Sequence, residues 1–420
     1  MSKVVFTCIL DTLMYIFRNN QKEISIWKKP VPFAGVVLLL LVLSGGFAWY
    51  ALSFSSKIVF DSVQPKLISP KRNLPEATDF FPGEKDGQVW HFAPGPISMR
   101  KIRSNGCVAD GLLSGYGEKT KEITAMFNRS NCIYLHRALE TWLRVPDFKE
   151  AESIMENVKL QPVVYGMFIA EAISTRKKYE DAVDGKKYHY EKMCREGTEG
   201  RWGADTCIPS VGNVEYRRYL KVITQRAMDI GIQSFLFGQI QLQDEKHNFQ
   251  ETEMKNILAD MRQYAQEKNM QIIVGAQTDD IVDEPYLRMF DYIEGGVGID
   301  VAGQVEDQPC SSNFASCWAL LWDKRYSAKA NNVFLHLDWS GLVWDDMGKF
   351  ARMTQEIRMQ TLQNLYAKFN TGNTGFMLPY LAVLNHQNEG CYGPNKDFYT
   401  PSNKYKCKDE DAMNQILPKL

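Results

Sequence analysis

The sequence of 420 residues has almost no net charge, because 49 lysines and arginines stand against 50 aspartates and glutamates. Binding to nucleic acid usually needs a concentrated basic face. The most basic stretch, residues 176–195, mixes its basic side chains with acidic ones, which is typical of a solvated loop. We therefore expect no nucleic-acid partner.

The sequence also lacks the short motifs of common cofactor and metal sites. Gly111, Gly115 and Gly117 do not have the GxGxxG spacing of a dinucleotide site. No Cys-x-x-Cys or His-x-x-x-His pair is present, and such spacings are typical of zinc ligands. We therefore expect neither a metal nor a cofactor.

Charge is absent from residues 33–52, an apolar run long enough to cross a bilayer as a helix. Basic residues outnumber acidic ones before it, so the positive-inside rule places the N-terminus in the cytoplasm. A cleaved signal peptide normally has a shorter apolar core nearer the N-terminus. We predict one uncleaved transmembrane helix and a main domain in the periplasm, the lumen or outside the cell.

The segments on either side of this helix complete the predicted topology. Residues 1–32 form a cytoplasmic segment, in which residues 2–17 have apolar side chains at near-helical spacing and are predicted to contact the membrane or a membrane partner. Residues 53–88 contain four prolines and little periodicity, which predicts an extended linker.

Eight of the nine cysteines follow the predicted transmembrane helix. An even number in an oxidising compartment indicates disulfide bonds. The count leaves the connectivity open, and consecutive pairing is the simplest proposal because three of the pairs close short loops. The predicted bridges are Cys107–Cys132, Cys194–Cys207, Cys310–Cys317 and Cys391–Cys407.

Strand-like apolar runs alternate with amphipathic segments from Cys107 onward, which is the order of parallel βα units. The predicted strands are 107–113, 132–140, 162–171, 232–241, 271–279, 292–298, 333–339 and 375–381. The predicted helices are 121–127, 148–157, 215–230, 251–268, 285–290, 316–329 and 345–369.

This alternation predicts an α/β fold, a (β/α)8 TIM-type barrel over residues 89–385, followed by a disulfide-closed tail over residues 386–420. Cys107 and Cys132 begin the first two strands, which are neighbours in a parallel barrel, so their disulfide and the barrel support each other. A doubly wound open sheet is the alternative, but its glycine-rich phosphate turn is missing.

The stretch Asn331 to Gly341, NNVFLHLDWSG, shows how such a strand delivers polar groups to one end of a barrel. At a period of two, Phe334, His336 and Asp338 share one face, which turns polar at its downstream end. Catalytic groups of barrel enzymes lie at the C-terminal ends of the strands. Polar residues in this position and phase are His136, Glu140, Glu171, Gln239, Gln241, Gln277, Asp279, Asp280, Glu294, His336, Asp338 and Tyr380.

Paired carboxylates with amides and aromatic rings are typical of glycoside chemistry, in which one acid protonates the leaving oxygen and another acts as nucleophile or base. We take Asp338, Asp279 and Glu171 as the catalytic candidates. Aromatic rings that can stack on sugars are Trp142, Trp339 and Trp344. The candidates for substrate binding are His136, Glu140, Gln239, Gln277, Glu294, His336, Trp339 and Tyr380.

Each of these residues also has a structural interpretation. The histidines can be hydrogen-bonded core residues, and the tryptophans can be packing residues. Glu140 and Glu171 can form ion pairs with Arg137 or Arg144, and Asp279 can cap a helix. The convergence of several acids on one barrel mouth favours the functional interpretation.

This pattern resembles the barrel glycoside hydrolases over about residues 90–385, in architecture and site chemistry rather than through a family motif. A large group of retaining barrel enzymes has Asn-Glu after strand four and Glu after strand seven. This chain has Gln239 and Asp338 there, so the mechanism of that group is not implied.

The site chemistry and this resemblance imply a glycosidase or transglycosidase that acts on a polysaccharide or oligosaccharide, and the predicted transmembrane helix implies that it is anchored in a membrane. A non-catalytic saccharide-binding barrel in a polysaccharide assembly or export complex is the alternative. Residues 135–141, LHRALET, are slightly similar to the His-Arg and Glu motifs of glycerophosphodiester phosphodiesterases, which implies a weaker third option that needs a divalent cation.

Overall fold

The computed structural model describes residues 95–160, 162–180, 187–306, 319–338 and 345–419. The predicted membrane segment 33–52 and both of its flanking segments lie outside this part of the chain, as do the Cys310–Cys317 bridge, Trp339 and Trp344. Within the described residues, none of the helices has the length and apolar character needed to span a bilayer.

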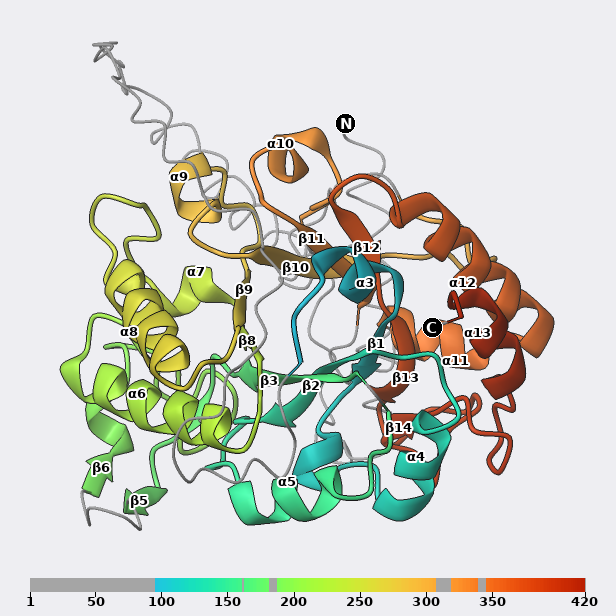
Figure 1. Cartoon of the computed structure of the whole chain (residues 1–420), viewed down its shortest axis with the longest axis horizontal. Coiled ribbons are helices and arrows are strands. Elements are labelled where there is room, and N and C mark those ends of the chain that lie inside the picture. Colours follow the sequence, from blue (N-terminus) through green and yellow to red (C-terminus); the bar gives the residue numbers. More distant parts are fainter. Residues whose placement is uncertain (1–94, 161, 181–186, 307–318, 339–344, 420) are drawn as a thin grey trace, which may run out of the picture. The chain divides into compact units, whose positions relative to one another are not determined.

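Nine parallel strand segments form the centre of the fold (Figure 1), and each of the eight predicted strands overlaps at least one of them, although residues 112–113 of the first lie in a 3-10 turn and residues 240–241 of the fourth lie in a helix. Their side chains are almost all buried, as expected for parallel strands covered on both faces. The segments are β1 (Gly106–Ala109), β2 (Tyr134–Glu140), β3 (Val164–Ile169), β8 (Ser234–Phe237), β9 (Ile273–Gln277), β10 (Tyr292–Val297), β11 (Val333–Leu337) and the pair β12 (Thr374–Phe376) and β13 (Leu378–Val383).

The strands follow one another in sequence order around a curled sheet. Only Met377 separates β12 from β13, yet β12 pairs in parallel with β11 while β13 pairs in parallel with β1. The last predicted strand is thus divided in two: β12 contacts the seventh strand, and β13 contacts the first. This arrangement is consistent with a TIM-type barrel, and the sequential order has no switch point of the kind that defines a doubly wound sheet.

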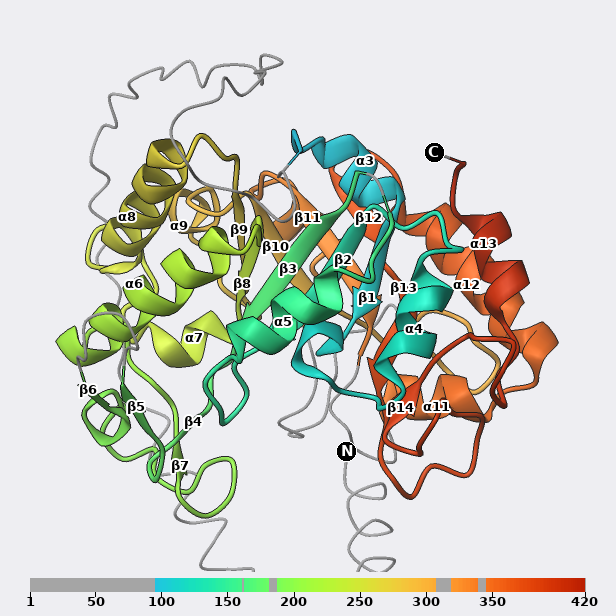
Figure 2. The ribbon, with the colours of Figure 1, turned by 60° about the horizontal axis from the view of Figure 1, so that its bottom comes forward.

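Helices lie around the outside of the sheet (Figures 1 and 2). In α8, buried side chains recur three or four residues apart, so one stripe of the helix faces the core. The helices are α3 (Met99–Ser104), α4 (Thr120–Phe127), α5 (Phe148–Met155), α6 (Val214–Asp229), α7 (Ile240–Gln243), α8 (Met254–Glu267), α9 (Glu284–Leu287), α10 (Lys324–Ser327), α11 (Asp346–Arg352), α12 (Gln355–Phe369) and α13 (Glu410–Ile416), with short 3-10 turns η1 (Leu112–Ser114) and η2 (Tyr190–Lys192).

Three predicted helices differ from the observed ones. The helix predicted over 345–369 is two helices, because Met353 and Thr354 adopt extended backbone and the Thr354 hydroxyl caps the second helix at the N–H of Ile357. Helix α9 is a single turn rather than the predicted 285–290, and α10 covers only four residues of the predicted 316–329.

Two excursions leave the barrel at the same end of the strands. The first follows β3 and contains β4 (Ile173–Ser174), which pairs with β7 (Thr206–Cys207), and the hairpin of β5 (Lys178–Glu180) and β6 (Lys187–His189). The second follows β13 and contains β14 (Phe398–Tyr399), which pairs with β13.

The disulfides Cys107–Cys132, Cys194–Cys207 and Cys391–Cys407 confirm three predicted bridges. The first joins the starts of β1 and β2, as the barrel predicts. The other two lie within the two excursions, and each closes a local loop.

Candidate functional site

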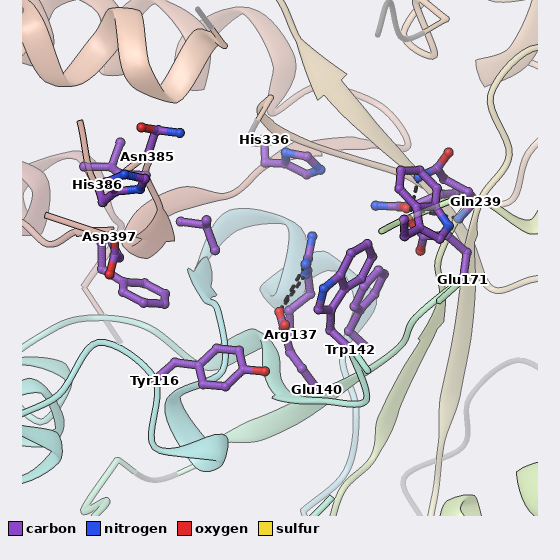
Figure 3. Close-up of a pocket in the computed structure, with 16 residues that line it drawn as sticks. Tyr116, Arg137, Glu140, Trp142, Glu171, Gln239, His336, Asn385, His386 and Asp397 are labelled. Carbon is purple, nitrogen blue, oxygen red and sulfur yellow. Dashed lines mark hydrogen bonds and ion pairs between the residues drawn. The ribbon is translucent and has the colours of Figure 1, made fainter. Parts of the chain in front are cut away.

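A cavity of about 480 Å³ lies at the C-terminal ends of the strands (Figure 3). This is the end of the barrel at which TIM-type enzymes hold their substrates. Its walls combine acids, amides and aromatic rings. The residues that line it are Tyr116, Arg137, Glu140, Trp142, Phe168, Glu171, Trp202, Gln239, Gln277, His336, Val383, Leu384, Asn385, His386, Asp397 and Phe398.

Arg137 reaches the cavity because β2 is irregular. The register of β2 against β3 shifts there, and Arg137 has φ of +55°, which is uncommon for a residue with a side chain. Its Nη2 atom lies 3.1 Å from Glu140 Oε1, and its Nε atom lies 3.4 Å from Asp110 Oδ1. The guanidinium carbon lies 3.9 Å from the ring centroid of Phe168. Arg137 is thus held between two carboxyl groups and an aromatic face.

Asp110 directly follows β1 and is fully buried beside Arg137. Its Oδ2 atom accepts a hydrogen bond of 3.2 Å from the N–H of Val383. Burial raises the pKa of Asp110 to about 8, against the opposing attraction of the Arg137 guanidinium. Of the two carboxyl groups beside Arg137, Glu140 is the closer, and it is the one that lines the cavity.

Glu171 is buried after the end of β3 and has only one of its two oxygens occupied. Its Oε1 atom accepts a hydrogen bond of 2.5 Å from Gln239 Nε2, while its Oε2 atom is buried and has no partner. Burial raises the pKa of Glu171, although the hydrogen bond from Gln239 and the charge of Arg137 oppose this. A carboxyl group in such surroundings holds its proton more firmly than one in water.

Gly238 makes room for this carboxyl group. A Cβ atom at Gly238 would collide with Glu171 Oε2 and with the ring of Phe168. The next residue, Gln239, has φ of +33°, so the chain turns sharply between β8 and α7 and carries the Gln239 amide toward Glu171. The backbone at the end of β8 therefore leaves room for the Glu171 carboxyl group and places the Gln239 amide where it can donate to that group.

Glu294 lies deeper in the barrel and is completely buried. Its Oε2 atom lies 2.8 Å from His136 Nε2, and its Oε1 atom lies 2.9 Å from His336 Nε2 and accepts a hydrogen bond of 3.0 Å from Gln277 Nε2. Burial would raise the pKa of Glu294, but the charge and hydrogen bond of His136, with the hydrogen bond from His336, hold it well below its usual range.

His336 contacts the second oxygen of Glu294. Its Nδ1 atom lies 2.7 Å from the carbonyl oxygen of Leu337, and its Nε2 atom lies 2.9 Å from Glu294 Oε1. Burial lowers the pKa of His336, against the opposing hydrogen bond and charge of Glu294.

A row of hydroxyl groups extends this network through the barrel interior. His136 Nδ1 lies 2.8 Å from the hydroxyl of Tyr134, which lies 2.9 Å from that of Ser234 and 3.3 Å from that of Tyr292. All of these side chains are buried. Hydrogen bonds of this kind satisfy polar groups that would otherwise destabilise the core.

Aromatic rings form much of the cavity wall. Trp142, from the turn after β2, and Trp202, from the excursion after β3, meet edge to face with their ring centroids 5.7 Å apart. Tyr116 and Phe398 lie 6.1 Å apart, and Phe398 comes from the second excursion. Both excursions thus bring an aromatic ring to the mouth of the barrel. Exposed polar side chains of His386 and Asp397 accompany Phe398 (Figure 3).

Five of the predicted site residues line this cavity, namely Glu140, Glu171, Gln239, Gln277 and His336. His136 and Glu294 lie beneath it in the hydrogen-bonded network. Trp142, predicted as a stacking ring, also lines the cavity.

The remaining predicted residues lie elsewhere. Asp338 and Asp279 do not line the described part of the cavity. Asp338 is buried, and its carbonyl accepts a hydrogen bond from the N–H of Met347. Asp279 is half-buried at φ of +46°, and burial and the neighbouring Asp280 raise its pKa. Trp339 lies outside the described residues.

Tyr380 faces away from the cavity, contrary to the predicted inward phase. Its ring stacks on Phe127 of α4, and its hydroxyl donates a hydrogen bond of 2.7 Å to Asn414 of α13. Val383 lies three residues after Tyr380, so its side chain points to the opposite face of the strand and lines the cavity instead. The alternation along β13 is therefore offset by one residue from the predicted one.

Several residues of the site carry a weak sequence signal or none. Asp110 directly follows β1. The predicted first strand extended to residue 113, so Asp110 was placed within the strand rather than at its C-terminal end. Trp202, Asp397 and Phe398 come from the two excursions, where no periodicity relates them to the barrel. The spacing of the cysteines was the only feature of the sequence that predicted contacts within those excursions.

The described residues contain one group of side chains close enough to hold a metal ion, formed by Cys391, Cys407 and Asp409. The two cysteines are joined as a disulfide, and Asp409 accepts hydrogen bonds from Arg358 and Tyr399. The disulfide and these hydrogen bonds explain why the three side chains lie together, so the group has a structural role.

No family model matches the chain, and no curated protein matches it. Solved structures that are similar include a GH27 β-L-arabinopyranosidase from Geobacillus stearothermophilus in complex with arabinose, at 10% identity and a TM-score of 0.36, covering 67% of this chain and 73% of that one. A cyclic alpha-maltosyl-(1-->6)-maltose hydrolase from Arthrobacter globiformis is 11% identical with a TM-score of 0.42, covering 78% and 77%. Amy13B of Eubacterium rectale is 10% identical with a TM-score of 0.43, covering 74% and 76%. The assignment of the fold rests on the strand order itself.

Proposed function

We propose that the chain is a glycoside hydrolase or transglycosidase that acts on a polysaccharide or oligosaccharide. The observation that carries this proposal is the pair of buried glutamates in one cavity with different surroundings. Glu140 forms an ion pair with Arg137, whereas burial raises the pKa of Glu171 and one of its oxygens has no partner. Two carboxyl groups whose environments differ in this way suit an acid and its ionised counterpart.

In this proposal Glu171 acts as the general acid. Its proton passes to the glycosidic oxygen as the bond to the anomeric carbon breaks, and Glu140 attacks that carbon or activates a water molecule. Arg137 forms an ion pair with Glu140, and Gln239 donates a hydrogen bond that orients Glu171. Asp338 and Asp279, the other acids suggested by the sequence, remain candidates that the same measurement tests.

The test is a panel of malto-, cello-, galacto- and chito-oligosaccharides, with binding and product release both measured. The Glu171→Gln variant should keep its affinity for sugar and lose about 10²–10⁴-fold in turnover. Glu267→Gln, the same change on the exposed surface of α8, is the matched control and should behave like the parent. Parental turnover in Glu171→Gln would remove this residue from the mechanism.

A non-catalytic saccharide-binding barrel is the second candidate. It is favoured by the occupation of Glu140 Oε1, which accepts from both Nε and Nη2 of Arg137 and is less available as a nucleophile. Binding across the panel without product release, unaffected by Glu171→Gln, would support this candidate and contradict the first.

We also propose that residues 33–52 anchor the chain in a membrane with the barrel outside the cytoplasm, in an assembly to which residues 2–17 contribute. The support is the apolar run and the charge distribution of the sequence. Full-length chain should stay in the membrane fraction after alkaline washing, and a chain that starts near Lys57 should be released. Release of the full-length chain would contradict the anchor.

A further inference from the structure

The wall formed by Trp142 and Trp202 has features that packing alone does not explain. Both indoles line the cavity, and their edge-to-face contact sets two flat surfaces at an angle of 64°. The indole N–H of Trp202 is buried and has no hydrogen-bond acceptor. A buried donor without a partner destabilises the free protein, and an oxygen atom of a ligand would remove that cost.

Trp202 is held in place by the excursion after β3. Its backbone N–H donates a hydrogen bond of 3.1 Å to the hydroxyl of Thr206, which in turn donates one of 2.6 Å to the carbonyl of Gly203. Thr206 belongs to β7, which also contains Cys207 of the Cys194–Cys207 disulfide. The loop that carries Trp202 is thus closed both by hydrogen bonds and by a covalent bond.

The same excursion is fastened to the catalytic candidate. Strand β4 begins two residues after Glu171, and Ile173 of β4 pairs with Cys207 of β7. The path from Glu171 to Trp202 therefore runs through one short antiparallel pair. Movement of this pair would change the position of Trp202 relative to the buried carboxyl group.

The apolar faces of a sugar ring match aromatic surfaces, and its hydroxyl and ring oxygens accept hydrogen bonds from an indole N–H. A sugar can therefore both stack on the indole rings and accept a hydrogen bond from the Trp202 N–H. An anionic sugar fits less well, because Glu140 and Glu171 line the same cavity and Arg137 is already paired with Glu140.

We propose that Trp142 and Trp202 form a stacking subsite for an uncharged pyranose ring, with the Trp202 indole N–H as donor, and that the Cys194–Cys207 loop sets saccharide specificity by positioning Trp202. This rests on the saccharide ligand of the proposed function. The subsite lies apart from the bond-breaking step, so it acts on affinity and on the choice of sugar rather than on the rate of the chemical step.

The experiment uses the full-length chain and the same panel of oligosaccharides. Trp202→Ala should raise Kd about tenfold with little change in kcat, since both the stack and the hydrogen bond are lost. Trp202→Phe should recover part of the affinity, because it keeps a ring without the N–H. Binding should change the indole fluorescence of the parent and of Trp322→Phe, whose indole packs on Phe369 away from the cavity, more than that of Trp202→Phe.

Two disulfide variants separate positioning from general stability. The double variant Cys194→Ser with Cys207→Ser should follow Trp202→Ala in Kd. The double variant Cys107→Ser with Cys132→Ser removes a bridge at the other end of the barrel, so it should lower Tm and keep the parental Kd at temperatures where it is folded.

The outcomes distinguish the subsite from the proposed function. A parent that binds no sugar in the panel overturns both. A parent that binds sugar while Trp202→Ala and Trp202→Phe keep its Kd overturns the subsite alone. An equal loss of affinity in the two disulfide variants overturns the role of the Cys194–Cys207 loop.

Discussion

Two buried glutamates in the same barrel have pKa values that their surroundings shift in opposite directions. Glu294, in the centre, has His136 against one oxygen and His336 and Gln277 against the other, and its pKa lies below the usual range. Glu171, at the cavity, has one oxygen without a partner, and its pKa is raised. Charged and hydrogen-bonding partners on both oxygens favour the ionised carboxylate, whereas burial with a single side-chain donor favours the protonated form.

The largest effect should follow removal of the central carboxylate. Glu294→Ala leaves His136 and His336 buried without their partner, so we expect a loss of about 3–5 kcal/mol in the free energy of unfolding. Urea denaturation measures this, and Glu267→Ala on the exposed face of α8 is the control. A loss no greater than that of the control would mean that Glu294 is not a structural anion.

Gly238→Ala should damage the site more than the fold. The added methyl group collides with Glu171 Oε2 and Phe168, so the carboxyl group must move, and a misplacement of this kind costs about 100-fold in turnover. Gly95→Ala places its methyl group in ordinary contact with Pro162 and should retain parental turnover. Steady-state kinetics on the two variants give the comparison, and equal rates would contradict the close-approach argument.

The buried carboxyl group of Asp110 should appear as a pH dependence of stability. Its folded pKa of about 8 lies above the ordinary value of 3.8, so between these values the unfolded chain has released a proton that the folded chain retains. The free energy of unfolding should therefore fall as the pH rises from about 4 to about 8. Asp110→Asn should show a weaker fall, as measured by denaturation at a series of pH values. Parallel curves for parent and variant would show that Asp110 does not retain its proton.

The smallest effect should come from the acids that the sequence ranked first. Asp338→Asn and Asp279→Asn alter side chains that do not line the described cavity, so each should lose less turnover than Glu171→Gln. Product release from the best oligosaccharide of the panel measures all three. If Asp338→Asn abolished turnover with folding intact, the catalytic assignment would return to the end of β11.

Much of the fold could be predicted because it depends on local patterns. The apolar runs and their spacing gave eight strands in the right order, and the cysteine spacing gave three bridges that the structure contains. The phase of a strand was harder to predict: Tyr380 faces outward and Val383 faces the cavity. One residue of offset reverses every side chain of a strand, and the sequence does not mark such an offset.

The sequence by itself predicted the order of the parallel strands, three of the bridges and the end of the strands at which polar groups gather, because periodicity and connectivity are local properties of the chain. Only the tertiary structure decided which acids meet. The irregular turn at Arg137, the space left by Gly238 and the arrival of Trp202 from a separate excursion are all long-range contacts. Such contacts set burial, charge and hydrogen bonding together, and these decide why Glu171 and Glu294 differ although both are glutamates in one barrel.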